Sequence, residues 1–225
     1  MKVIIEKYLA GIMADEFHRY KSWDNCFKSY SSSTKTDIHI LELAFYLASW
    51  GMYRGSGGLL QKNHLIHKGA VDIIFSKTSQ KLKCNQNTEI KREKIKDIIE
   101  LKDELAKHYS SIYFTKGAEN PKPISPTDTL LSKIILGTLG CVPAYDRYFI
   151  GGLKEMKIKH TGFNEASLNE LFNFIDDNKN EIDRAQKNIK AETQSHYPLM
   201  KILDMYFWQI GYDKEVKEKK QKKGK

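Results

Sequence analysis

The stretch Ser125–Phe149, SPTDTLLSKIILGTLGCVPAYDRYF, decides how this chain folds. Ser125-Pro126-Thr127-Asp128 predicts a helix start, because serine caps, proline fits the first turn and the acid completes a capping-box pattern. Apolar residues follow at helical spacing as far as Gly140, where we expect the helix to end. The loop Cys141-Val142-Pro143 then leads to a short helix over about residues 144–149.

Helical spacing continues on both sides of this stretch. The predicted helices cover about residues 3–30, 38–50, 64–75, 91–113, 163–190 and 197–210. The segment 38–50 is apolar almost all round, so we expect its helix to be central. The glycines at 55, 57 and 58 and the proline-containing stretch 116–123 predict irregular connections. We therefore predict an all-α fold, a compact two-lobed helical bundle over residues 1–212, whose lobes meet between these two connections.

The chain of 225 residues has 37 Lys and Arg against 28 Asp and Glu, a net charge of +9. Residues 213–225, DKEVKEKKQKKGK, hold seven lysines and three acids and account for +4 of it. Because this stretch lacks apolar anchors, we expect a disordered basic tail, either a tether to a polyanion or a solubilising terminus. The remaining +5 mildly favours an acidic partner.

The three cysteines are odd in number and lack the spacing of a disulfide framework or a zinc knuckle, which indicates a reducing, cytoplasmic location. No apolar run approaches the ~20 residues needed to cross a bilayer. Glu6 and Lys7 occupy the place of a signal peptide's apolar centre, which argues against secretion.

Several catalytic signatures are absent from the sequence. It contains no GxxxxGK[ST], no strand followed by GxGxxG, no HExxH and no GxSxG. Hydrolysis of nucleoside triphosphates, dinucleotide redox chemistry and zincin proteolysis therefore have no support. His64 and His67 share a helical face, but no third ligand at matching spacing completes a metal site, so we expect none.

Two clusters of aromatic, amide and charged residues remain. The first joins residues 18–26, HRYKSWDNC, to residues 48–56, ASWGMYRGS. Such a mixture is typical of a pocket in which a planar base stacks and is hydrogen-bonded at its edge. Alternatively, its two tryptophans fill the core between the first helices. Arg54, followed by Gly55 and Ser56, favours a loop that grips phosphate, because glycine lets the backbone approach closely.

The second cluster is the opening stretch itself. Asp146 lies six residues after Gly140, between Tyr145 and Arg147. A carboxylate behind such a loop can orient a water molecule or stabilise a cationic sugar. Alternatively, Asp146 is an N-cap or first-turn acid of its own helix. The N-terminus of the preceding helix, with Ser125 and Thr127, exposes N–H groups that favour a phosphate.

This order of elements resembles the catalytic core of the helix-hairpin-helix DNA glycosylase superfamily. Its members have a hairpin, a helix that ends in glycine, a proline-containing loop and a catalytic aspartate that opens the next helix. Residues 130–140 match the helix, residues 141–145 the loop and Asp146 the aspartate. The whole chain, with its SWD and ASWGMYRGS segments, is also similar to small bacterial anti-phage glycosylases that remove glucosylated hydroxymethylcytosine from modified phage DNA.

The sequence departs from the family in two places. Residues 122–128 stand where the family has a Gly-x-Gly hairpin. The glycines with which the family binds phosphate are therefore missing at this place. Bifunctional members have a Schiff-base lysine in or just after the hairpin, whereas Lys133 lies a full turn or more farther along the helix. The resemblance therefore implies a monofunctional enzyme with no lyase step. No four-cysteine iron–sulfur motif occurs, and no cofactor is expected.

The resemblance implies a monomeric enzyme that flips a modified base out of double-stranded phage DNA and hydrolyses its N-glycosidic bond. Asp146 would stabilise the oxocarbenium-like sugar, with Lys133 as the candidate lysine. The expected base pocket comprises Trp23, Asp24, Trp50, Tyr53, Gln61 and Tyr145. The expected DNA-binding residues are Arg54, Gly55, Ser56, Lys116, Lys122, Ser125, Thr127 and Arg147.

Two other functions fit the same residues. One is a non-enzymatic helical nucleic-acid-binding module, in which Arg54 and the basic tail supply affinity and Asp146 is a cap. The other is a helical interaction or scaffold protein whose aromatic clusters are core.

Overall fold

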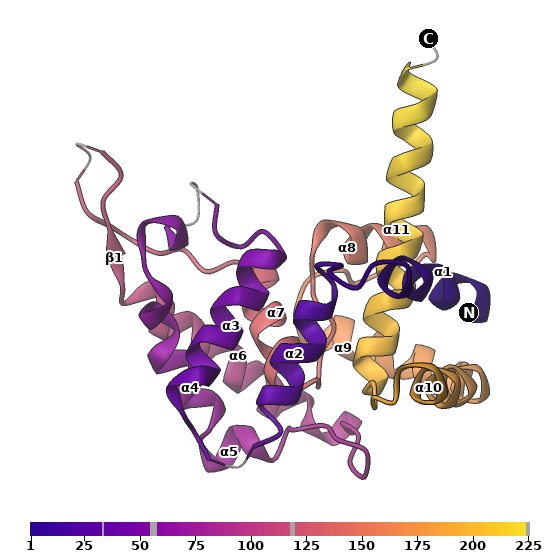
Figure 1. Ribbon diagram of the computed structural model, residues 1–225, viewed down its shortest axis with the longest axis horizontal. Coiled ribbons are helices and arrows are strands. Elements are labelled where there is room, and N and C mark those ends of the chain that lie inside the picture. Colours follow the sequence, from indigo (N-terminus) through magenta and orange to yellow (C-terminus); the bar gives the residue numbers. More distant parts are fainter. Residues whose placement is uncertain (33, 55–57, 118–119, 224–225) are drawn as a thin grey trace.

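The computed structural model describes residues 1–32, 34–54, 58–117 and 120–223 (Figure 1). Over these residues the chain is mostly helical, which confirms the predicted all-α class. The α-helices are α1 (Lys2–Met13), α2 (Lys21–Ser29), α3 (Asp37–Ser49), α4 (Lys68–Ile74), α5 (Lys77–Gln80), α6 (Ile95–Ser110), α7 (Asp128–Thr138), α8 (Arg147–Glu155), α9 (Glu165–Asp177), α10 (Lys179–Thr193) and α11 (Leu199–Lys223). Short 3₁₀ helices cover Leu59–Gln61, His64–His67 and Arg92–Lys94. Strands β1 (Tyr113–Phe114) and β2 (Lys122–Pro123) pair antiparallel.

The helices form two groups with α2 and α7 between them (Figure 1). One group contains α3, α4, α5 and α6, and the β1–β2 hairpin extends from it. The other contains α8, α10 and α11, and the N-terminal helix α1 packs there against α10 and α11. The N-terminal helix therefore lies with the C-terminal helices, and the two groups are not the first and second halves of the chain.

Helix α7, which contains Lys133, is the most deeply buried helix in this part of the molecule. Its nine residues from Leu130 to Thr138 are all buried, including Ser132 and Lys133. The central place was expected for α3 instead, but Ile38, Leu41 and Phe45 of α3 are exposed. An apolar composition does not distinguish a helix with a solvent-facing apolar stripe from a fully buried one.

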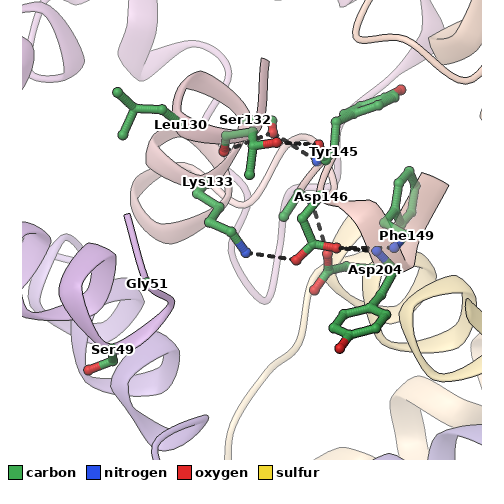
Figure 2. A network of polar contacts seen from close by, with 12 residues as sticks. Ser49, Gly51, Leu130, Ser132, Lys133, Tyr145, Asp146, Phe149 and Asp204 are labelled. Atoms are coloured by element: carbon green, nitrogen blue, oxygen red, sulfur yellow. Dashed lines mark hydrogen bonds and ion pairs between the residues drawn. The ribbon is translucent and has the colours of Figure 1, made fainter. Parts of the chain in front are cut away.

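The boundaries of α7 agree with the expected start and end to within a few residues. The N-cap is Thr127 rather than Ser125, because the Thr127 hydroxyl accepts a hydrogen bond from the backbone N–H of Leu130 at 3.2 Å. After the helix ends, Gly140 adopts φ +70°, a left-handed conformation that glycine reaches without strain. This turn directs residues 141–145 back along α7 toward the start of α8 (Figure 2).

Two expected long helices are each divided in the structure. Residues 14–20 separate α1 from α2, and the Asp15 carboxylate accepts a hydrogen bond from the N–H of Phe17 within this turn. The expected helix 163–190 is interrupted at Asn178, whose backbone angles of φ −117° and ψ 18° are not helical. Asparagine favours such breaks because its side chain competes for backbone hydrogen bonds.

Helix α8 crosses α11 at two glycines. A Cβ atom at Gly152 would lie 1.9 Å from the carbonyl oxygen of Phe207, and one at Gly211 would lie 1.9 Å from that of Tyr148. The two backbones can approach this closely because neither position carries a side chain. The crossing fixes the start of α8 against the middle of α11.

The prediction of a disordered tail from Asp213 is wrong for the described residues, because α11 continues as a helix to Lys223. Ion pairs explain this order. Asp213 pairs with Lys7 of α1 at 2.6 Å, and Lys214 pairs with Glu155 of α8 at 2.6 Å. Lysine and glutamate are also good helix formers. No helix in the described part of the chain is long and apolar enough to span a membrane.

Candidate active site

An ion pair between α7 and α8 lies at the centre of the candidate site (Figure 2). Lys133 Nζ is 3.0 Å from Asp146 Oδ2. The Lys133 side chain is 3% exposed and that of Asp146 is 14% exposed. Because charges so far from bulk water need partners, the two side chains hold each other in place.

Asp146 is also the N-cap of α8. Its Oδ1 atom accepts hydrogen bonds from the backbone N–H groups of Tyr148 at 3.0 Å and Phe149 at 3.1 Å (Figure 2). Each carboxylate oxygen therefore has a different task, one toward the helix N-terminus and the other toward Lys133. Asp146 therefore has the capping role that the sequence offered as an alternative, and the same carboxylate also pairs with Lys133 at the candidate site.

The loop before Asp146 is held by three hydrogen bonds. The N–H of Tyr145 donates to the Ser132 hydroxyl at 2.8 Å, and the Thr129 hydroxyl donates to the Tyr145 carbonyl at 2.8 Å. The N–H of Ala144 donates to Asp204 Oδ1 on α11 at 3.0 Å. These contacts fix Asp146 relative to α7 and α11, as an electrostatic group in a catalytic site requires.

A cavity of about 510 Å³ opens above the ion pair. This volume is within the range of sites for small organic ligands. We call it the central cavity. It is lined by Arg19, Trp50, Gly51, Met52, Arg54, Leu59, Ser125, Thr127, Thr129, Leu130, Lys133, Asp146, Arg147, Tyr148 and Trp208.

Three aromatic rings form a continuous wall of the central cavity. The rings of Trp50 and Trp208 meet edge to face with centroids 6.3 Å apart, and Tyr148 contacts Trp208 at 5.0 Å. Lys133 Nζ lies 4.5 Å from the Trp50 ring centroid. The indole nitrogens of Trp50 and Trp208 are buried and have no hydrogen-bond partner among the described residues. Flat rings with a cation and a carboxylate beneath them suit a planar, polar ligand.

Three arginines give the central cavity a positive rim. Arg54 Nε donates to the carbonyl of Gly51 at 2.5 Å, and Gly51 itself adopts φ +69°. Arg19 donates to the carbonyl of Ser49 at 3.3 Å. Arg147, with a side chain 68% exposed, lies 3.5 Å from Glu215 of α11. Guanidinium groups on a rim favour an anionic ligand such as a phosphate.

A second buried ion pair lies behind the central cavity. Lys201 Nζ is 2.9 Å from Asp204 Oδ2, with side chains 3% and 5% exposed. Both pairs border a narrow space beside Trp50 and Trp208 that has no room for a water molecule. Lys201 Nζ approaches the Trp50 ring at 5.8 Å. Trp50 is thus in contact with both lysines.

The central cavity contains about half of the residues expected at the site. Those that line it are Trp50, Arg54, Ser125, Thr127, Lys133, Asp146 and Arg147. They come from the end of α3, the start of α7 and the start of α8, so the fold joins the two sequence clusters. Lys133, although farther along its helix than the family's lysine, reaches the aspartate directly.

Trp23, Asp24 and Tyr145, expected in the base pocket, do not line the central cavity. Trp23 is 2% exposed, stacks on Phe27 and donates its indole N–H to the carbonyl of Leu136. Tyr145 is buried, with its hydroxyl 2.9 Å from that of Ser167. Burial raises the pKa of Asp24, which faces away toward Tyr197 and Lys201. Trp23 and Tyr145 fill the core, and Asp24 is half-buried, because helix packing turns all three away from the cavity.

Tyr53 and Gln61 are likewise outside the central cavity. Tyr53 is half-buried, with its hydroxyl 2.8 Å from Nε2 of His67, and burial raises its pKa. Gln61 is exposed. Tyr53 is only three residues from Trp50, but the left-handed turn at Gly51 separates the directions of the two side chains.

The remaining expected DNA-binding residues that the structure describes, Lys116 and Lys122, lie in the β1–β2 hairpin. Lys116 is exposed in the β1–β2 hairpin, and Lys122 of β2 lies over the ring of Phe114 at 5.5 Å. The hairpin projects from the edge of its helix group (Figure 1). Gly55 and Ser56 are outside the described residues.

Arg19, Tyr148 and Trp208 line the central cavity but were not predicted there. Arg19 and Tyr148 lie inside the two clusters, so their composition contained a signal for them. Trp208 is more than 60 residues from Asp146 in a helix that reads as ordinary core. It reaches the cavity through the α8–α11 crossing, which no local pattern indicates.

Comparison of the chain with protein families, with curated proteins and with solved structures finds no match. Within the described residues, no group of three His, Cys, Asp or Glu side chains is arranged to hold a metal ion.

Proposed function

We propose that the protein is a DNA glycosylase that flips a modified base into the central cavity and cleaves its N-glycosidic bond, leaving an abasic site. The buried Lys133–Asp146 pair beneath an aromatic wall carries this proposal. The arrangement combines the three requirements of the reaction: a surface on which a base stacks, a positive rim for the DNA backbone and a fixed carboxylate.

The proposed chemistry begins with the departing base. As the bond between C1′ and the base nitrogen lengthens, positive charge develops on the sugar, and Asp146 stabilises it electrostatically. A water molecule attacks C1′, its proton leaves to solvent or the departing base, and the base carries away the bonding electrons. Asp146 is already held by Tyr148, Phe149 and Lys133, so little reorganisation is needed at this step.

Lys133 offers a second route at the same atom. An unprotonated lysine amine can attack C1′ directly, which replaces the water and gives a covalent Schiff base once the sugar ring opens. The position of Lys133, a turn or more beyond that of the lysine in bifunctional members of the superfamily, favours water as the nucleophile. Reduction with borohydride during turnover decides, because it converts only a Schiff base into a stable protein–DNA adduct.

The substrate class that we propose is an enlarged cytosine, glucosylated hydroxymethylcytosine in phage DNA, with antiviral defence as the role. The size of the central cavity supports a base with a substituent, and the Arg19 and Arg54 side chains offer donors for sugar hydroxyls. This assignment rests on the resemblance of the whole chain to anti-phage glycosylases.

The test is abasic-site formation. Genomic DNA from unmodified and from hypermodified phages is incubated with the protein, treated with alkali and examined for strand breaks. We expect breaks in the modified DNA with the parent protein and their loss with Asp146→Asn. Asp72→Asn is the matched control, because Asp72 also pairs with lysines but on the surface of α4. Breaks that persist in Asp146→Asn, or no breaks on any substrate, would overturn the proposal.

A non-enzymatic nucleic-acid-binding module is the second candidate. The capping role of Asp146 favours it, because a cap alone accounts for an aspartate at this position. Salt-dependent binding to duplex DNA without strand breaks identifies this function. If the protein does not bind DNA at all, the remaining candidate is a helical interaction or scaffold protein.

A further inference from the structure

The outer part of α11 extends beyond the body of the molecule. Figure 1 shows the helix continuing well past α1 and α8, and it ends at Lys223. Among the described residues, Asp213, Lys214 and Glu215 make the last ion pairs that join the helix to the body. Residues Lys217, Lys219, Lys220 and Lys222 beyond them are all exposed.

One side of α11 leads directly out of the central cavity. Trp208 lines the cavity, and Tyr212 stacks on Trp208 at 5.1 Å with the rings nearly parallel. Glu215 follows and pairs with Arg147 of the cavity rim and with Lys219. At about 100° per residue, Lys219 and then Lys222 come within roughly 40° of the direction of Trp208. This side of the helix therefore changes from aromatic to basic as it leaves the cavity.

The other two lysines point elsewhere. By the same geometry Lys217 lies about 180° and Lys220 about 120° from the direction of Trp208. Of the four lysines beyond Glu215 whose side chains the structure describes, two thus lie on the cavity side and two on the outer sides. A tether that acts only through net charge makes no distinction between these two pairs, whereas a docked surface does.

The distances suit a duplex engaged at the central cavity. With a rise of about 1.5 Å per residue, Lys219 lies about 16 Å and Lys222 about 21 Å along the helix from Trp208. Each DNA strand carries a phosphate about every 3.4 Å along the duplex axis. A helix held rigidly at the cavity therefore presents these lysines to phosphates several base pairs away from a flipped nucleotide.

We propose that Lys219 and Lys222 on the cavity side of α11 bind the phosphate backbone of the duplex whose nucleotide occupies the central cavity. The outer part of α11 is then a directional DNA-binding arm. This inference rests on the proposed function for the identity of the ligand. It adds a binding surface outside the cavity. It also assigns a function to the helical conformation of residues 213–222.

The experiment compares two double variants with the same change in charge. Lys219→Gln with Lys222→Gln removes the cavity-side pair, and Lys217→Gln with Lys220→Gln removes the outer pair. Binding to a 30-base-pair duplex is followed by fluorescence anisotropy at several salt concentrations. Circular dichroism of both variants checks that the helix remains, since glutamine has a helix propensity close to that of lysine.

The cavity-side variant is expected to lose about two phosphate contacts, so that the slope of log K against log salt becomes shallower by about 1.8. The outer variant should keep the parent slope. Equal losses in the two variants would overturn the directional arm and leave a simple tether. Failure of the parent to bind duplex DNA would overturn both this inference and the proposed function. Side-dependent binding by a protein that produces no abasic sites supports the arm and overturns only the glycosylase.

Discussion

The molecule contains two buried lysine–aspartate pairs that differ in what surrounds them. Lys133–Asp146 and Lys201–Asp204 have nearly equal separations, 3.0 and 2.9 Å, and both lysines contact Trp50. The first pair forms the floor of the central cavity, whereas the space next to the second excludes water. The same pair of residue types thus faces a cavity large enough for a ligand in one place and is enclosed in the other.

Their hydrogen bonds reinforce the difference. Asp204 uses its second oxygen to accept the N–H of Ala144, two residues before Asp146. The enclosed pair therefore holds the loop that positions the open pair. We infer that Asp204 is a positioning residue, which acts on the candidate chemistry through Asp146 and does not touch the substrate.

The largest effect is expected from Asp204→Asn, a loss of about 3–5 kcal/mol in the free energy of unfolding. The substitution removes the carboxylate 2.9 Å from the buried ammonium of Lys201, where there is no room for water, and leaves only Asp24 as an acidic group toward it. Urea unfolding, followed by tryptophan fluorescence, measures it. Adding Lys201→Met should restore much of the loss, because the double variant no longer buries the Lys201 ammonium. A double variant as unstable as the single one would contradict this explanation.

Asp146→Asn is expected to reduce base excision by about 10²–10³-fold, the effect of removing one preorganised electrostatic group. Its loss of stability should be smaller than that of Asp204→Asn. Asparagine remains a good N-cap, and water in the central cavity can hydrate Lys133. Single-turnover excision and urea unfolding of the two variants provide the comparison. If Asp146→Asn unfolds as readily as Asp204→Asn, the open and enclosed pairs do not differ as proposed.

The α8–α11 crossing joins the helix that begins after Asp146 to the helix that contains Lys201 and Asp204. Gly152→Ala or Gly211→Ala should push these two helices apart. Each new methyl group meets a backbone carbonyl, and we expect a loss of about 1–3 kcal/mol in unfolding free energy. Gly151→Ala is the matched control, because its Cβ would be 3.5 Å from the nearest atom. That variant should be neutral or more stable, since alanine favours helices. Equal effects of Gly151→Ala and Gly152→Ala would argue against the close crossing.

Local patterns in the sequence predicted the segment around the open pair well. The helix before Gly140, the loop and the aspartate at the start of α8 are all found in the expected order. Each depends on residues within a few positions of one another, namely a capping hydroxyl, a left-handed glycine and an N-cap carboxylate. Such local preferences act before tertiary packing does.

The composition of the cavity wall could not be predicted in the same way. Trp23 and Trp50 belong to the same aromatic cluster of the sequence, yet the first is core and the second lines the cavity. Trp208 enters only because two glycines let α11 approach α8. Which face of a helix is covered depends on contacts between segments that are distant in the sequence, and periodicity contains no information about them.

A third buried polar group, the imidazole of His67, differs from both pairs because it is uncharged. His67 Nε2 lies 2.8 Å from the hydroxyl of Tyr53, and Nδ1 lies 2.7 Å from that of Tyr109. Burial, with smaller contributions from His108 and His64, lowers the pKa of His67 from 6.5 to about 3. A neutral imidazole satisfies both hydroxyls, since one ring nitrogen donates and the other accepts.

This neutral group should make the fold sensitive to acid. Between pH 6.5 and 3 the unfolded chain binds a proton that the native His67 does not, so its stabilising contribution decreases as the pH falls through this window. The expected slope is about 1.4 kcal/mol per pH unit, or about 2 kcal/mol between pH 6.5 and 5. Urea unfolding at half-unit steps measures it. His67→Gln should be less stable at pH 7.5 but should lack this slope, whereas His64→Gln should retain it. A slope that persists in His67→Gln would assign the acid sensitivity to another group, and the charged pairs would be the next to test.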